Sequence, residues 1–468
     1  MFGNRTLFGK VDFRLPFFYI EMFFKDNQLY PQTERDECIM KTVLPQPRRV
    51  MVTAVASAMC MGAGQIMNRQ IIKGILYISA FLFSVLYAIP YCIYCIEDLI
   101  SLGTIPGKEH SLFLIVHGLL AIVILAYFLF LYVGNIRDAY RTAAARAAGE
   151  EAPGFFAGLK AFFSRRKALI IVSPGVVAVI LVVILPLVFS ILIGFTSYDS
   201  FNQPPGKLLS WVGIKNFVSI FTIKSWAATF WGVLGWTLCW TVLSSVLPYA
   251  LGVITAVVMN NPRVKGKRFF KTVFILPYAI PGYIMILVWR SMFDTDFGLI
   301  NTMLGSIGIE PVQWLHQVGS ARFALVLVAL WSGFTFPFML SDGILKSIPS
   351  DLYEAARLDG ASSFLCFRRI TLPLLFFSIA PMFIMGLAGA FNNFNLIYLL
   401  TEGGPPDIVF QGAGQTDILI SWLFKMTFNL HNYKLASAIS LIIFIFIGTF
   451  SIISLRRTRS FKEEDMVQ

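Results

Sequence analysis

Eight long apolar runs constrain the fold of this chain more than any other feature of its sequence. A helix needs about 20 apolar residues to cross a bilayer, and each run is close to that length or longer. The runs lie at 74–96, 111–136, 168–196, 233–259, 272–290, 323–342, 374–398 and 435–455. They predict an all-α fold, a polytopic transmembrane helical bundle of about eight spans.

A ninth run, at 50–68, is uncharged but rich in Ala, Ser, Thr and Gly, and basic residues flank both of its ends. A span with positive charge at both ends conflicts with the positive-inside rule. We therefore expect an interfacial or re-entrant element here, with a true span as the alternative.

The composition agrees with a membrane protein, since 57% of the residues are hydrophobic and 14% are charged, against about 25% charged in soluble domains. The net charge of +12 does not indicate nucleic-acid binding, because membrane proteins hold Lys and Arg in cytoplasmic loops. The cysteines and histidines show no metal-ligand spacing, and we interpret the pair Cys92-x-x-Cys95 as small membrane-embedded residues rather than a metal or redox motif. The sequence predicts no metal and no cofactor, and its first 47 residues predict no cleavable signal peptide.

The basic residues give the spans one orientation. Four segments rich in Lys and Arg fall on the same side if the eight spans alternate, and that side must be the cytoplasm. They are 137–167, 260–271, the segment with Arg357, Arg368 and Arg369, and the tail with Arg456, Arg457, Arg459 and Lys462. Both termini are then cytoplasmic.

The Ala- and Arg-rich segment 137–167 is the best domain boundary, because two spans precede it and six follow it. The expected organisation is a cytoplasmic N-terminal segment (1–49), an N-terminal membrane region with two spans and the possible re-entrant element (50–136), a cytoplasmic linker (137–167), a core of six spans (168–458) and a cytoplasmic tail (459–468).

The polar segment 349–373, between the sixth and seventh spans, carries the strongest functional signal. Ser350 is expected to be the N-cap of a short helix, and Gly360 to end that helix in the left-handed conformation. A second short helix should follow Ser362 or Ser363. Such a cytoplasmic helix–turn–helix could dock in a groove of another protein or remain a surface connector, and local physics alone does not separate the two.

The spacing in this segment resembles the EAA motif of importer-type ABC transporter permeases. The motif runs Glu-Ala-Ala, three residues, Gly, nine residues, Ile-x-Leu-Pro. Every position is filled here, by Glu354, Ala355, Ala356, Gly360, Ile370, Leu372 and Pro373, with Asp359 before the glycine. Pro373 is expected near the start of the next span, where its missing N–H costs little. In that family the loop is the coupling helix that docks on the nucleotide-binding subunit.

The resemblance extends over about 170–460 and implies the six-span core of a type I ABC importer. The partners it implies are a second permease subunit, two ATPase subunits, an extracellular solute-binding protein and the lipid bilayer of a bacterial cell membrane. "FNNFNLIYLLT" (391–401) and "TDILISWLFKMTF" (416–428) look most like the larger permease subunit of maltose and maltodextrin importers. The loop at about 197–232 is short, however, where the enterobacterial maltose permease has a large external domain.

ATP hydrolysis is expected in a separate chain, and this chain is not expected to be an enzyme. A phosphate-binding loop would need Gly-x4-Gly-Lys followed by Ser or Thr, and the sequence contains none. The nearest stretch, "GTIPGKEH" (103–110), has the wrong spacing.

Polar residues near the external half of the seventh span are candidates for the substrate path. Asn392 and Asn395 are three residues apart and would share one helix face, with Asn393 beside them and Phe391 and Tyr398 on or next to that face. Amides and aromatic rings suit a sugar, although interhelical hydrogen bonding by Asn is the alternative. Maltose-type permeases bind sugar with residues of this stretch, and Gly333 and Phe336 match a second sugar-facing stretch of that family, with Phe336 in place of Tyr.

These features favour the permease subunit of an ATP-driven importer for a carbohydrate, of the maltose or maltodextrin type. An ion-coupled secondary transporter is the alternative, but that class carries charged groups inside its spans. The cores of the last six spans have none, and Asp342 and Arg290 lie at the edges. A scaffolding protein would leave the EAA spacing unexplained.

Overall fold

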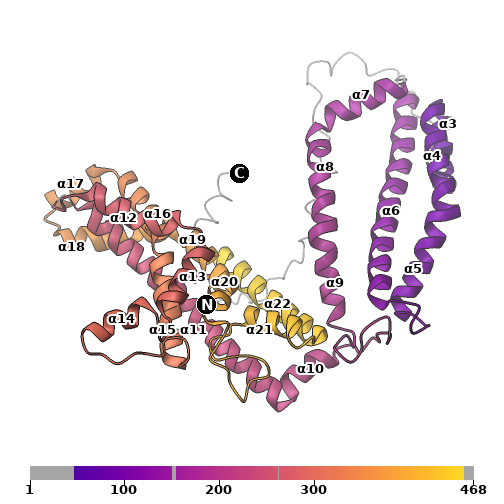
Figure 1. The fold of residues 1–468 in the computed structure, drawn as a ribbon. Coiled ribbons are helices and arrows are strands. Elements are labelled where there is room, and N and C mark those ends of the chain that lie inside the picture. The colour runs from indigo at the N-terminus through magenta and orange to yellow at the C-terminus, as the bar shows by residue number, and fades with distance from the viewer. Residues whose placement is uncertain (1–46, 150–153, 262, 458–468) are drawn as a thin grey trace, which may run out of the picture. The chain divides into compact units, whose positions relative to one another are not determined.

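The computed structural model describes residues 47–149, 154–261 and 263–457, and its regular structure in that part of the chain is helical (Figure 1). The chain divides into two compact units. Of the described residues, one unit contains those up to Tyr87 and those within Tyr127–Arg166, and the other contains Ala88–Ala126 and those from Lys167 onward. The expectations for the segment before residue 47 and for the tail after residue 457 lie outside the described residues.

The candidate spans agree with the eight apolar runs. Within the described residues, seven continuous helical runs are long and apolar enough to cross a membrane, and a bent pair of helices makes an eighth. The continuous runs are α4–η1–α5 (Ile71–Ser101), α6 (Ser111–Ala147), α8–η2–α9 (Lys167–Ile193), α11 (Lys224–Asn260), α15–α16 (Val318–Ser347), α18–η3–α19 (Ser363–Phe391) and α22 (Tyr433–Arg457, counted to Ile453). The bent pair is α12 (Lys267–Ala279) and α13 (Gly282–Met292). The all-α transmembrane bundle is thereby confirmed.

Segment 50–68 does not form a continuous helix. It contains α2 (Pro47–Met59) and α3 (Ala63–Met67), separated by a turn at Gly62 with φ +93°. A Cβ on Gly62 would lie 2.2 Å from the carbonyl oxygen of Gly74, so this turn requires glycine. Because α2 has 13 residues and α3 has five, neither reaches the length of a membrane-spanning helix.

The hairpin of α2 and α3 packs on the end of α6 through buried polar side chains. Ser57 donates to Gln65 Oε1 (3.0 Å), the Gln65 amide donates to the carbonyl of Asn135 (3.0 Å), and the Asn135 amide donates to the carbonyl of Ser57 (3.2 Å). All three side chains are fully buried. At the edge of this network Lys73 pairs with Asp138 at 2.6 Å.

A π-helical turn precedes a proline in three of the spans. The turns η1 (Ser84–Ala88), η2 (Ile180–Ile184) and η3 (Phe367–Thr371) are each followed two residues later by a proline, at Pro90, Pro186 and Pro373. A proline ring clashes with the carbonyl four residues before it, and the wider π turn moves that carbonyl away. The spans therefore stay continuous through these prolines, although Pro248 lies within α11 without such a turn.

The core of the second unit is built around α11, which packs against α15, α16 and α19. One buried apolar cluster joins α11 to α21 (Leu419–Phe428) and α22 around Trp422, and another joins α11 to α13, α15 and α20 (Phe394–Thr401) around Trp240. The remaining helices of this unit are α10 (Lys215–Thr222), α14 (Leu299–Ser306) and α17 (Ser350–Leu358). In the first unit, α7 (Phe155–Arg165) follows α6.

Candidate functional site

The segment that carries the EAA motif forms two short helices joined by a tight turn. α17 ends in a Schellman motif, in which the N–H of Gly360 donates to the carbonyl of Arg357 (3.0 Å) and the N–H of Ala361 to that of Ala356 (2.9 Å). Gly360 has φ +82°, as expected from its position. The next helix, α18 (Ser363–Cys366), has Ser362 as its N-cap. The predicted helix–turn–helix is confirmed.

One local expectation for this segment was wrong. The N-cap of α17 is Pro349, and Ser350 is the first helical residue, with its hydroxyl directed at Asp351 (3.3 Å). Pro373 lies in the first turn of α19 (Leu372–Phe391), as expected, although the continuous helical run that contains it begins at Ser363. The π turn η3, which spans Ile370 and ends just before Leu372, accommodates the proline inside this run.

Most of the segment is exposed. None of the nine residues of α17 is buried, and Glu354, Ala355 and Asp359 are exposed while Ala356 is half-buried. Apolar side chains are exposed as well, with Leu358 at 90% and Phe364 at 70%. The hydroxyls of Tyr353 and Thr371 lie 2.9 Å apart and hold α17 against η3. A polar segment that exposes several large apolar side chains has the character of a docking surface.

A second candidate site is a pocket of about 470 Å³, beside two interruptions in the spans. α12 and α13 are bent by 96° at Ile280–Pro281, and α19 ends at Phe391 just before α20 begins. The pocket is lined by Gly282, Tyr283, Met285, Ile286, Ser332, Asn393, Asn395 and Leu396. It therefore gathers two amides, one hydroxyl and one phenol ring from α13, α15 and the start of α20.

The structure brings together only part of the predicted substrate-path set. Asn393 and Asn395 line the pocket. Asn392 is the C-cap of α19 and Asn393 the N-cap of α20, so the expectation that Asn392 and Asn395 share one helix face was wrong. The predicted seventh span, 374–398, likewise ends at Phe391 rather than continuing as one helix.

The other predicted residues lie elsewhere. Phe391 is buried against Phe446, and Tyr398 stacks on Phe394 with ring centroids 5.0 Å apart. Gly333 packs against Pro248 of α11, where a Cβ would lie 3.2 Å from the proline, and Phe336 is exposed. Sequence reasoning missed Tyr283 and Ser332. The stretch "LPYAIPGY" (276–283) could have indicated the break near Tyr283, because its two prolines and a glycine interrupt an apolar run.

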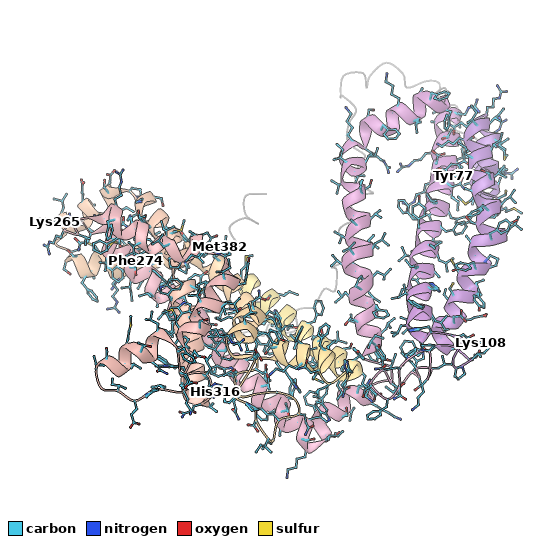
Figure 2. The ribbon with its side chains drawn as sticks, in the orientation of Figure 1. Tyr77, Lys108, Lys265, Phe274, His316 and Met382 are labelled. Carbon is cyan, nitrogen blue, oxygen red and sulfur yellow. The ribbon has the colours of Figure 1, made fainter. Side chains whose placement is uncertain are left out.

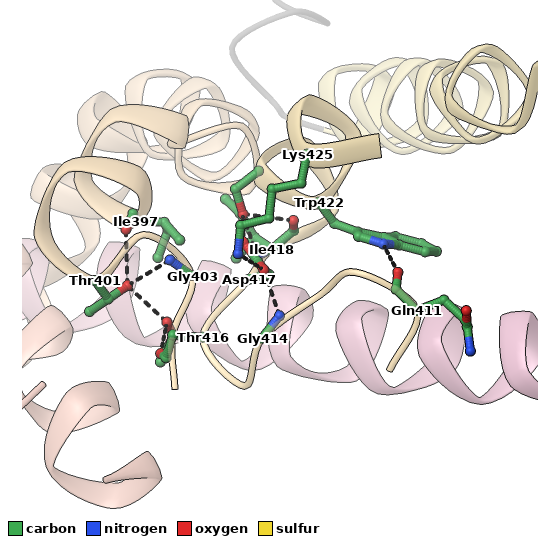
Figure 3. A network of polar contacts seen from close by, with 12 residues as sticks. Ile397, Thr401, Gly403, Gln411, Gly414, Thr416, Asp417, Ile418, Trp422 and Lys425 are labelled. Atoms are coloured by element: carbon green, nitrogen blue, oxygen red, sulfur yellow. Dashed lines mark hydrogen bonds and ion pairs between the residues drawn. The ribbon is translucent and has the colours of Figure 1, made fainter. Parts of the chain in front are cut away.

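A buried polar network orders the loop between α20 and α21 (Figure 3). The Asp417 carboxylate accepts from Lys425 (2.6 Å), Ser421 (2.7 Å) and the N–H of Gly414 (2.7 Å). Burial raises the pKa of the Asp417 carboxyl above its usual value, against the lowering effect of Lys425 and the hydrogen bonds. Gly403 has φ +75°, and a Cβ there would lie 2.0 Å from the Asp417 carboxylate, so the "TEGGP" stretch requires glycine at this position.

The fold resembles that of a solved transporter. A chain of a bacterial ABC transporter involved in the import of the acidic polysaccharide alginate matches with a TM-score of 0.53, over 64% of this chain and 98% of that chain. The two sequences are 21% identical, so this match shows the shared fold alone.

Several relatives are similar in sequence over most of the chain. The galactooligosaccharides transport system permease protein GanP of Bacillus subtilis is 38% identical over 406 residues, which cover 86% of this chain and 96% of the relative. The maltodextrin transport system permease protein MdxF of the same organism is 36% identical over 424 residues, 87% of this chain and 95% of the relative. The maltose/maltodextrin permease protein MalF of Salmonella typhimurium is 39% identical over 268 residues, 56% of this chain and 52% of the relative.

The sequence similarities define the class as that of ABC importer permeases. The chain belongs to the family of binding-protein-dependent transport system inner membrane components, whose profile matches residues 248–458. It is a multi-pass membrane transport subunit and not an ion-coupled secondary transporter. The family inferred from the sequence is thereby confirmed.

Proposed function

We propose that this chain forms the translocation path for an oligosaccharide, and that the pocket between α13, α15 and α20 contacts the sugar. The observation that carries the proposal is the convergence of Asn393, Asn395, Ser332 and Tyr283 on one pocket. Amide and hydroxyl groups can exchange hydrogen bonds with sugar hydroxyls, and a phenol ring offers a flat face to the apolar side of a sugar ring. The volume also lies in the range of small-molecule sites.

Maltodextrin is the first substrate to test, and galactooligosaccharide the second. Permeases named for these two substrates are more than 30% identical to this chain. Maltodextrin and galactooligosaccharide are both chains of hexose units, and they differ in the orientation of their hydroxyls and in their linkages. The pocket residues supply donors and acceptors that serve either sugar, so the pocket supports the class of substrate rather than one member of it.

We further propose that α17 and α18 form the coupling segment on which a separate ATPase chain docks. The exposed side chains of Leu358 and Phe364 support this, since a water-exposed apolar surface on an otherwise polar segment favours a protein partner. Glu354, Ala355, Ala356, Asp359 and Gly360 form the docking helix and its turn, and Ile370, Leu372 and Pro373 lead into the span. The complex would contain two ATPase subunits, a second permease and an extracellular solute-binding protein.

The proposed location is the cell membrane of a bacterium, with both termini in the cytoplasm. This places the linker 137–167 and the coupling segment on the cytoplasmic side, with the six-span core at 168–458. We also propose that the hairpin of α2 and α3 is a re-entrant or interfacial membrane element. Its polar side chains turn inward to one another, while Met51, Val55 and Met59 face outward, an arrangement suited to hydrocarbon rather than water.

Uptake of labelled maltodextrin and galactooligosaccharide by a strain deleted for this gene, complemented with variants, tests the proposed sugar contact. Asn393→Ala and Asn395→Ala should raise the half-saturation concentration, because a lost hydrogen bond that leaves a buried partner unpaired costs about 1–3 kcal/mol. Asn392→Ala is the matched comparison, since Asn392 is the adjacent amide and does not line the pocket. Unchanged kinetics in both pocket variants, with normal expression, would favour interhelical bonding instead.

A further inference from the structure

Asp342, near the end of α16, connects three helices through one carboxylate. Its oxygens accept from the amide of Asn260 on α11 (2.8 Å), from Lys271 on α12 (2.6 Å) and from Lys346 on α16 itself (2.7 Å). The Asp342 side chain is only 14% exposed. A carboxylate so placed is strongly dependent on its partners, because removing one side of a partly buried ion pair leaves the other charge uncompensated.

The contact with Lys271 belongs to a wider interface between α12 and α16. The ring of Phe274, labelled in Figure 2, makes edge contacts with Phe334 and Phe338, with centroids 6.0 Å and 5.8 Å apart. The hydroxyl of Thr335 donates to the carbonyl of Phe274 (2.9 Å). Apolar contacts of this kind allow small sliding between helices, whereas the ion pair with Asp342 fixes one point along them.

The two helices lead to the two candidate sites. α16 ends at Ser347, and α17, the proposed docking helix, begins at Ser350. α12 passes through the bend at Ile280–Pro281 into α13, which lines the pocket. α13 is in turn tied to α20 by an ion pair between Arg290 and Glu402 at 2.7 Å. A continuous series of packed helices therefore joins the proposed coupling segment to the pocket, and Asp342 lies at the contact between α16 and α12 in this series.

We propose that Asp342 is a positioning residue that transmits movement of the coupling segment to the pocket, by fastening α12 to α16 through Lys271. When the ATPase moves α17, the ion pair makes α12 follow α16 rather than slide along it. The break after α12 then changes the direction of α13 and with it the shape of the pocket. This inference rests on the proposed docking of an ATPase at α17.

The test is the number of sugar molecules taken up per ATP hydrolysed, measured in proteoliposomes that contain the complete complex. Asp342→Asn and Lys271→Met should lower this ratio about fivefold or more, the usual size of a coupling between two sites, while the ATPase stays bound. Asp342→Glu should restore part of the ratio. Lys346→Met is the matched control, because Lys346 binds the same carboxylate from the same helix and cannot join α12 to α16.

Three results would overturn the inference. The first is an unchanged sugar-to-ATP ratio in both Asp342→Asn and Lys271→Met, and the second is an equal loss of that ratio in Lys346→Met. The third is release of the ATPase by the variants, which would show that the contact serves docking of the ATPase. Failure of the proposed function is seen separately, in the wild-type complex. It would appear there as no ATPase retained or no uptake of either sugar, before any variant is compared.

Discussion

Replacing Gly360 with valine should weaken binding of the ATPase subunit through the backbone alone. Gly360 has φ +82°, and a Cβ built on it meets no atom within 4 Å, so the substitution creates no clash with a neighbouring residue. What remains is the cost of a left-handed conformation in a β-branched residue, about 1–3 kcal/mol. Since each 1.4 kcal/mol is a factor of ten in an equilibrium constant, the equilibrium constant for forming the α17 turn should fall about 5- to 150-fold.

The destabilised turn should lower the affinity for the ATPase, because few other contacts hold the turn in place. No side chain of α17 is buried, and the Schellman hydrogen bonds and the contact between Tyr353 and Thr371 are its main attachments. The assay is a pull-down titration of the ATPase on detergent-solubilised permease. The order of affinity expected is wild type, Gly360→Asn, Gly360→Ala and Gly360→Val, because Asn tolerates the left-handed region better than Ala and Val.

A second glycine provides the control for backbone strain. Gly107 also has φ +82° and nothing within 4 Å of a Cβ, but it lies in the turn between α5 (Ile89–Ser101) and α6, on the side expected to be external. Gly107→Val therefore carries the same kind of backbone cost and should leave ATPase affinity unchanged. If Gly360→Val bound the ATPase as tightly as wild type, or if Gly107→Val weakened it equally, the assignment of 349–373 as the docking segment would be refuted.

Three further predictions concern other parts of the chain. Glu354→Lys should reduce ATPase co-purification about fivefold or less, since an exposed ion pair contributes little, and no reduction at all would remove Glu354 from the interface. Burial opposes ionisation of Asp199, but the ion pair with Lys434 at 2.5 Å outweighs the effect of burial and lowers the pKa of the Asp199 carboxyl. The stabilisation from this ion pair is therefore complete above the ordinary carboxyl pKa and is lost as the pH falls through the lowered pKa. Asp199→Asn should make thermal stability vary less between pH 5 and 2. A photo-crosslinking residue at Met59 should label lipid and one at Thr53 should label protein, whereas protein adducts at Met59 would contradict the membrane placement of α2.

The sequence predicted the spans and the helix–turn–helix of 349–373, because these depend on local properties. Hydropathy is a sum over neighbours, and the left-handed turn at Gly360 follows from the conformational freedom of one residue. The pocket was predicted only in part, because it depends on where spans are interrupted. Asn392 and Asn395 fall on one face only if the helix continues between them, and the averaged hydropathy of 374–398 does not register the break.

Long-range partners were the least predictable. Asp342 was interpreted as a charge at the edge of a span, and the sequence gives no sign that Lys271, on another helix, reaches it. The π turns were missed as well, since the prolines that follow them predict a kink or a helix start and not one extra residue in the preceding turn. In each case the deciding information is the position of a second helix or carbonyl, which no local pattern contains.

The π turn before Pro373 has a consequence for the direction in which α17 and α18 point around the axis of α19. One extra residue in a helical turn rotates everything before it by about 100° around the helix axis, relative to an uninterrupted helix. η3 lies between α18 and α19, so it determines the direction in which α17 and α18 point around the axis of α19. Pro373, through the π turn before it, therefore sets the rotation of α17 and α18 relative to α19. A chain in which Pro373 became alanine and one residue of η3 were deleted would keep every side chain of α17 and α18 but turn them to another direction around the axis of α19.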